Sequence, residues 1–158
     1  MNDLTMERRL TARLADVWAM WTTAAEIEQW WGPSGFGVRV RALDLRVGGV
    51  LDYVMVAQDL AMVDYLRANG MASETPVTLT FTEVTPMTRL AWRHVVDFIP
   101  DHPPYATDHL LELTQDGDAV HLRVSIGRMH DALWTERSRK GWEEELNKLV
   151  ALFAARVT

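Results

Sequence analysis

The chain has 158 residues, of which 48% are hydrophobic and 24% are charged, and its formal net charge is −6. This composition is that of an ordinary globular protein, and the length suits one domain over residues 1–158. The acidic balance argues against a nucleic-acid surface, and the absence of cysteine excludes disulfides and thiolate chemistry. No apolar run is long enough to span a membrane, and the N-terminus lacks a signal-peptide core, so we expect a cytoplasmic protein.

The N-terminal part begins with a strand and continues with two short helices. Residues 4–10 alternate as a strand does, and residues 15–22 have apolar side chains at helical spacing. A second helix over residues 25–31, capped by Thr22 or Thr23, should end at Gly32 and Pro33.

A hairpin with an inserted helix is predicted next. Residues 36–45 and 50–57 form its strands around the turn at Gly48 and Gly49. Residues 59–70 have helical spacing instead, and Asn69 with Gly70 is a helix-ending signal. The apolar residues of this inserted helix predict a lid or an oligomer contact, which would make a homodimer. Four of them carry this prediction, namely Leu60, Met62, Val63 and Leu66.

The rest of the chain predicts further strands and one long helix. The strands occupy residues 77–81, 90–96, 105–114 and 120–126 and are joined by short turns, which predicts an antiparallel meander. Residues 131–157 predict an amphipathic helix with Asp131 as its N-cap, packed on that sheet. Its apolar face carries Trp142, Leu146, Leu149, Val150, Phe153 and Val157.

The same face of the long helix is polar near its start, at Thr135, Ser138 and Arg139. A dry core would leave such groups unsatisfied, so we expect them at the solvated mouth of a cavity beneath the first half of this helix.

Several motifs together resemble one family. They are Val17-Trp18-Ala19-Met20-Trp21-Thr22, Trp30-Trp31-Gly32-Pro33-Ser34-Gly35-Phe36, Asp44-Leu45-Arg46-Val47-Gly48-Gly49, the Thr85-Pro86 turn and Gly141-Trp142. The chain resembles the Hsp90-ATPase-activator homologue (AHSA1-like) branch of the SRPBCC/START superfamily over nearly its whole length. The resemblance implies an α+β helix-grip fold, similar to the Bet v 1 allergens. In that fold a curved antiparallel sheet of six to seven strands, two short helices and the long C-terminal helix enclose an apolar cavity.

The expected ligand-binding residues follow from the inward faces of these elements. If the strand face with Leu90 and Trp92 points inward, His94 also points into the cavity, and His109 does so with Thr107. The alternative for each histidine is a hydrogen-bonded place in the core or on the rim. The complete expected set is Leu51, Tyr53, Met55, Trp92, His94, His109, Trp134, Ser138 and Arg139.

Binding of a small apolar molecule or lipid is the leading functional hypothesis. The alternative is an enzyme of the polyketide cyclase, dehydratase or hydrolase kind, for which Tyr53 and His94 are the only nominated acid/base pair. A third hypothesis, an Hsp90 co-chaperone, comes only from the family's name, and we do not expect Hsp90 as a partner. No metal-binding, phosphate-binding or nucleophile motif is present, so no cofactor or metal is expected.

Overall fold

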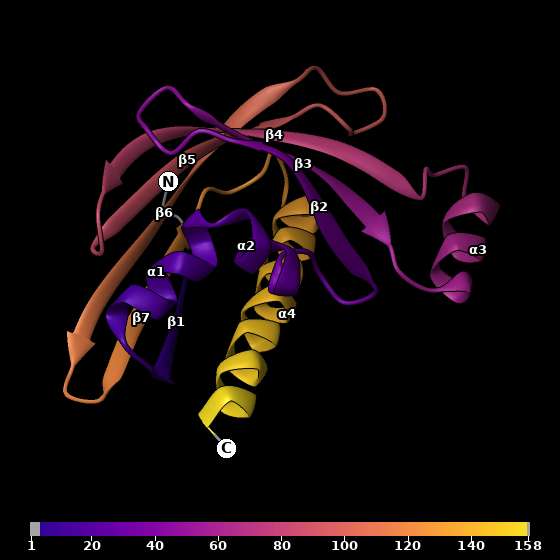
Figure 1. Ribbon diagram of the computed structural model, residues 1–158. Helices are drawn as coiled ribbons and strands as arrows, with labels where there is room; N and C mark the ends of the chain where they lie inside the picture. The colour runs from indigo at the N-terminus through magenta and orange to yellow at the C-terminus, as the bar shows by residue number, and fades with distance from the viewer. Residues whose placement is uncertain (1–3, 158) are drawn as a thin grey trace.

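The computed structural model describes residues 4–157, in which a curled sheet arches over one long helix (Figure 1). Residues 1–3 and 158 of the expected domain lie outside the described residues. The elements are β1 (Leu4–Thr11), α1 (Leu14–Thr22), α2 (Ala24–Trp30), β2 (Phe36–Leu43), β3 (Val50–Ala57), α3 (Leu60–Ala68), β4 (Glu74–Thr85), β5 (Arg89–Val96), β6 (Tyr105–Asp116), β7 (Ala119–Ile126) and α4 (Ala132–Val157).

Seven strands within residues 4–157 form one antiparallel sheet in the order β1-β7-β6-β5-β4-β3-β2. Consecutive strands from β2 to β7 are neighbours, including β3 and β4, between which α3 is inserted. The first strand instead joins the last, with Leu4 opposite Ile126 and Thr11 opposite Ala119. The predicted α+β fold with a curved antiparallel sheet and a long C-terminal helix is confirmed.

The core lies between the concave face of the sheet and the helices. Alternate residues of β7 point inward, and Val120, Leu122, Val124 and Ile126 are all fully buried. Tryptophans from α1, α2, β5 and α4 pack against one another at this interface, with ring centroids 4.6 to 6.3 Å apart. Edge-to-face and offset contacts of this kind stabilise aromatic clusters beyond the area that they bury.

The long helix begins as its sequence predicts. Asp131 Oδ1 accepts a hydrogen bond from the backbone N–H of Trp134 (2.8 Å), which confirms this residue as the N-cap of α4. Farther along the helix, Leu146, Leu149 and Phe153 are buried against the sheet. Trp142 and Val150 are half-buried, and the side chain of Val157 lies outside the described residues.

The second helix is not capped as expected. Thr23 precedes α2, but its side chain makes no capping hydrogen bond. Packing fixes this helix instead, because Trp30 is buried and its Nε1 donates to the backbone carbonyl of Met20 (2.8 Å).

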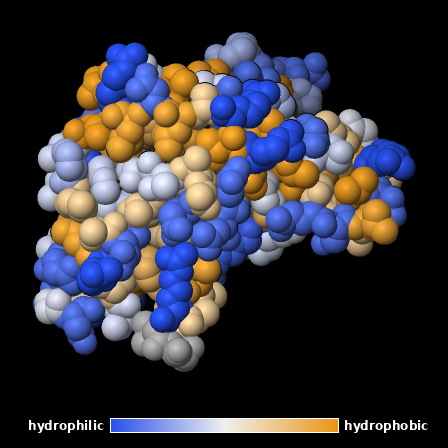
Figure 2. Space-filling model, viewed as in Figure 1, coloured by the Kyte–Doolittle hydropathy of each residue, from blue (hydrophilic) through white to orange (hydrophobic). Residues whose placement is uncertain are grey.

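The inserted segment is a helix, α3, whose N-cap Asp59 accepts from the backbone N–H of Met62 (2.7 Å). Leu66 is buried, whereas Leu60 is 80% exposed. Figure 2 shows hydrophobic surface over this helix, at the right of the view. The apolar side chains of α3 are therefore only partly covered.

Candidate functional site

A hollow of about 730 Å³ lies between the concave face of the sheet and the N-terminal half of α4, and we call it the central pocket. Strands β3 to β6 and helix α4 supply most of its wall, together with Trp31 and residues 69–72. Residues two apart on a strand face the same side, so Trp92 and His94 both reach it from β5. The expected site residues that line it are Tyr53, Met55, Trp92, His94, His109 and Trp134.

Aromatic rings form the deep end of the central pocket. Trp31 is the residue after α2, and the chain turns away at Gly32, whose φ of 101° favours glycine. The Trp31 ring lies 5.6 Å from that of Trp142 and 6.3 Å from that of Tyr53, between centroids. The tryptophan thus packs in the core and lines the pocket at once.

A buried carboxyl group, that of Glu145, also lies at this end. Burial raises its pKa to about 8, although the ammonium of Lys148 and the backbone N–H of Gly32 act in the opposite direction. Its Oε2 atom has no hydrogen-bond partner among the described residues. Burial and the nearby Glu145 carboxylate also raise the pKa of Tyr53.

The ammonium of Lys148 is occupied elsewhere. Its Nζ donates to the carbonyls of Gly32 and Phe36, both at 2.8 Å, and so ties α4 to the loop after α2. Burial lowers the pKa of this group. A carboxyl without a partner for one oxygen therefore remains in the pocket wall.

Two histidines, His94 on β5 and His109 on β6, form a second polar part of the pocket wall. His109 is buried, stacks on Trp92 at 5.7 Å, and bonds through Nε2 to the hydroxyl of Thr107 (3.0 Å). Its Nδ1 has no partner among the described residues. Burial, with a smaller contribution from His94, lowers the pKa of His109 to about 3, and burial also lowers that of His94. Both imidazoles are therefore neutral at neutral pH.

The mouth of the pocket is apolar with one cation. Met71 and Phe98 line it and are 58% and 49% exposed. The guanidinium of Arg137 lies 4.9 Å from the centroid of the Trp134 ring, in a cation–π contact. A smaller hollow of about 230 Å³ shares this region and includes Ser138.

Three expected site residues do not line the central pocket, and one of them, Ser138, lines only the smaller hollow. Leu51 is buried in the core beside the central pocket. Arg139 pairs with Glu136 and with Glu143 (2.6 Å), on the outer side of α4. The expectation that Arg139 marks the mouth is therefore corrected, because carboxylates one turn away on its own helix bind it.

Thr135 is also not at a solvated mouth. It is buried, and its hydroxyl accepts from the backbone N–H of Met129 (3.0 Å) and donates to the carbonyl of Asp131 (2.7 Å). The backbone just before α4 thus satisfies this polar group on both sides of its hydroxyl.

Sequence reasoning missed Glu145 and Arg137. Glu145 follows Trp142 by three residues and precedes Leu149 by four, so the helical period alone places it within the apolar face. An acidic residue at such a position is a usable signal of a functional group. Arg137 precedes Ser138, which was expected on the inward face of the long helix, and no feature of the sequence singled out Arg137 itself.

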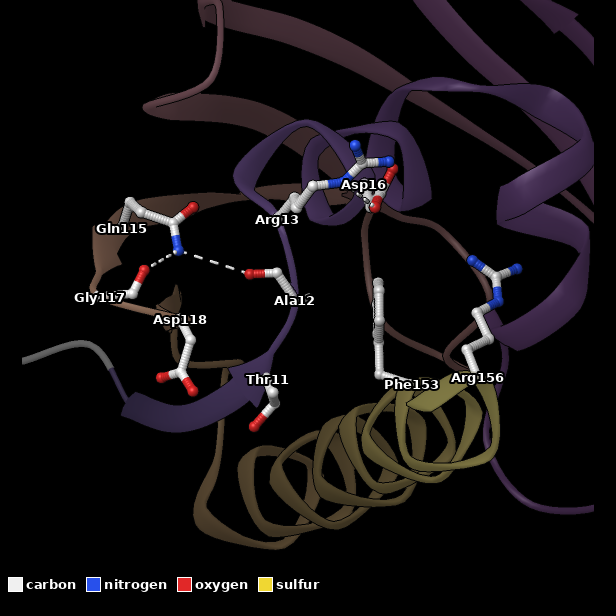
Figure 3. A pocket seen from close by; sticks show the side chains of 9 residues that line it. All are labelled: Thr11, Ala12, Arg13, Asp16, Gln115, Gly117, Asp118, Phe153 and Arg156. Carbon is white, nitrogen blue, oxygen red and sulfur yellow. Dashed lines mark hydrogen bonds and ion pairs between the residues drawn. The ribbon is translucent and has the colours of Figure 1, made fainter. Parts of the chain in front are cut away.

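A groove of about 490 Å³ lies at the opposite end of the molecule, near the end of α4 (Figure 3). Both of its guanidinium groups are paired, Arg13 with Asp16 (3.1 Å) and Arg156 with Glu26 (3.0 Å). We assign this groove no function.

Neither a metal site nor a membrane span stands out in the part of the chain that is described. Within residues 4–157, no three His, Cys, Asp or Glu side chains are grouped so that they could hold a metal ion. None of the helices there is long and apolar enough to cross a membrane.

A curled sheet that grips a long C-terminal helix defines the helix-grip, Bet v 1-like class of proteins. The sequence matches the family described as activator of Hsp90 ATPase homolog 1-like protein over residues 11–154, and the chain belongs to this family. It has no match among curated proteins.

Solved structures with the same fold come from several bacteria. Protein CV1439 from Chromobacterium violaceum is 22% identical, with 96% of each chain covered and a TM-score of 0.76. The AHSA1 protein from Silicibacter pomeroyi is 23% identical, with 98% of this chain and 99% of that chain covered and a TM-score of 0.74. CalU16 from Micromonospora echinospora is 19% identical, with 94% and 73% covered and a TM-score of 0.64. These similarities establish the fold.

Proposed function

We propose that the protein binds a small, largely apolar molecule in the central pocket. The pocket's volume of about 730 Å³ supports this proposal, since ligand pockets typically measure about 300–1,000 Å³. Its lining is mainly aromatic and aliphatic, with a few polar groups that could orient a ligand. A lipid or another apolar metabolite fits this description.

Native mass spectrometry of the purified protein tests the proposal directly. We expect a co-purified molecule that organic solvent extracts. Titration with the neutral dye N-phenylnaphthylamine, whose emission rises in apolar surroundings, gives an affinity. His94→Ala and Tyr53→Phe should weaken dye binding, and Arg139→Ala, outside the pocket, is the matched control. If the folded protein carries no such molecule and does not bind the dye, the proposal fails.

Catalysis in the same pocket is a second candidate, and the carboxyl of Glu145 is the observation that favours it. A carboxyl with a pKa of about 8 can give or take a proton near neutral pH, and Tyr53 lies in the same wall. The reaction would be of the cyclase, dehydratase or hydrolase kind. Incubating the extracted molecule with fresh protein decides this point, because a catalyst changes its mass or, for a ring closure that conserves mass, its chromatographic retention, and a carrier returns it intact.

A further inference from the structure

The Glu145 carboxyl defines the deep end of the central pocket as a place for a positive charge. The side chain is buried and lines the pocket, and its Oε2 atom has no hydrogen-bond partner among the described residues. We propose that the molecule bound in the central pocket carries an amine, whose ammonium group pairs with Glu145. This inference rests on the proposed function, since it names the chemistry of the ligand for the same pocket.

Neither Lys148, which acts on Glu145, nor Arg137, which lines the pocket, is placed to take this role. Lys148 gives two of its protons to the carbonyls of Gly32 and Phe36. Arg137 precedes Glu145 by eight residues, which is about 12 Å along the helix, and it lies over the Trp134 ring at the mouth. A buried carboxyl can ionise only beside a cationic partner, so a cation that pairs with Glu145 has to come with the ligand.

The neighbours of Glu145 favour an ammonium group over a neutral donor. Three aromatic residues line the pocket with Glu145, namely Trp142, one turn earlier on α4, Tyr53 on β3 and Trp31. Tyr53 interacts electrostatically with Glu145, and Trp31 precedes Gly32, whose backbone N–H lowers the pKa of Glu145. Aromatic faces attract an ammonium group, most strongly where water is excluded. A hydroxyl would donate one hydrogen bond to the carboxyl but would leave any negative charge without a counter-charge.

A proton balance follows from this pairing. Burial keeps the Glu145 carboxyl protonated at neutral pH, so pairing with an ammonium ion releases its proton to solvent. Burial lowers the pKa of both imidazoles and raises that of Tyr53, so these groups do not supply the proton near neutral pH. The titratable groups that share the pocket or act on Glu145 are Tyr53, His94, His109, Arg137, Glu144 and Lys148.

The test compares two probes that differ only in their polar end, phenylbutylamine and phenylbutanol. Quenching of tryptophan fluorescence gives both affinities, because Trp31, Trp92 and Trp142 line the pocket. We expect the wild type to prefer the amine by about tenfold to a hundredfold, the range for hydrogen bonds to charged groups. Glu145→Gln should remove this preference, and Glu144→Gln, one residue away and outside the pocket lining, should keep it.

Calorimetry of the wild type provides a second readout that needs no variant. In two buffers with different ionisation enthalpies, the heat of amine binding should reveal a released proton, and that of alcohol binding should not. Equal affinities for the two probes, or an amine preference that survives Glu145→Gln, overturns the amine proposal and leaves the proposed function standing. If neither probe binds the folded protein, both proposals fail.

Discussion

The buried carboxyl of Glu145 should make the stability of the protein fall as the pH rises. In the folded protein its pKa is about 8, compared with 4.5 for an ordinary glutamate. The folded state therefore keeps a proton that the unfolded chain loses. The stabilisation that results is complete below the unfolded pKa and is lost as the pH rises through about 8.

The magnitude follows from the same two pKa values. Each pKa unit corresponds to about 1.4 kcal/mol, so the complete loss for Glu145 is roughly 5 kcal/mol. Between about pH 5 and pH 9 the free energy of unfolding should fall by about 4 kcal/mol because of this residue. The amide of Glu145→Gln does not titrate, so the variant lacks this loss.

Urea unfolding of the wild type and of Glu145→Gln across this pH range measures the effect. The difference between the two proteins at each pH cancels the titration of every group that they share, including His109, which acts in the opposite direction. The free energy of unfolding of the wild type, relative to that of Glu145→Gln, should fall as the pH rises. A difference that changes by less than about 1 kcal/mol over the whole range would refute the assignment of a buried, protonated carboxyl.

Three further predictions concern other residues. His109→Phe should move the midpoint of acid unfolding, followed by circular dichroism, to lower pH. The reason is that the folded wild type keeps this imidazole neutral down to about pH 3, while the unfolded chain takes up a proton below about pH 6.5. An unchanged midpoint contradicts this prediction. Leu146→Ala should cost about 2–5 kcal/mol in urea unfolding because the side chain is fully buried, whereas the exposed Leu133→Ala should change it by less than about 0.5 kcal/mol, and similar costs would refute the packing. Lys148→Met leaves two partly buried backbone carbonyls without their donor and should cost about 1–3 kcal/mol, and an equal effect of Lys140→Met, at an exposed position, would argue against this role.

The fold could be predicted because its signals are local. Alternating residues and short turns specified the meander, and Asp131 marked the start of the long helix within one residue. The second helix starts within one residue of the prediction, with Thr23 at the N-cap position, but packing of Trp30 rather than a side-chain hydrogen bond of Thr23 fixes it.

The candidate site could be predicted only in part, since side-chain reach matters as much as position on a helical wheel. Thr135 and Arg139 share a face by angle, yet the short hydroxyl finds backbone partners and the long guanidinium finds two carboxylates on its own helix. Glu145 was overlooked because it is the last of three consecutive glutamates, which together suggest a solvated face. Its position between Trp142 and Leu149 in the helical period was the better guide.

The placement of β1 beside β7 sets an order for folding. The hairpins from β2 to β7 join strands that are near in sequence, whereas Leu4 must wait for Ile126 before it can pair. Contacts between such distant residues form late, because a long loop must close before they contribute stability. On the ribosome the first strand to be synthesised would then be the last to be incorporated into the sheet. Pulsed hydrogen exchange during refolding should accordingly show the amides of β1 becoming protected after those of the β5–β6 hairpin, and simultaneous protection would exclude this order.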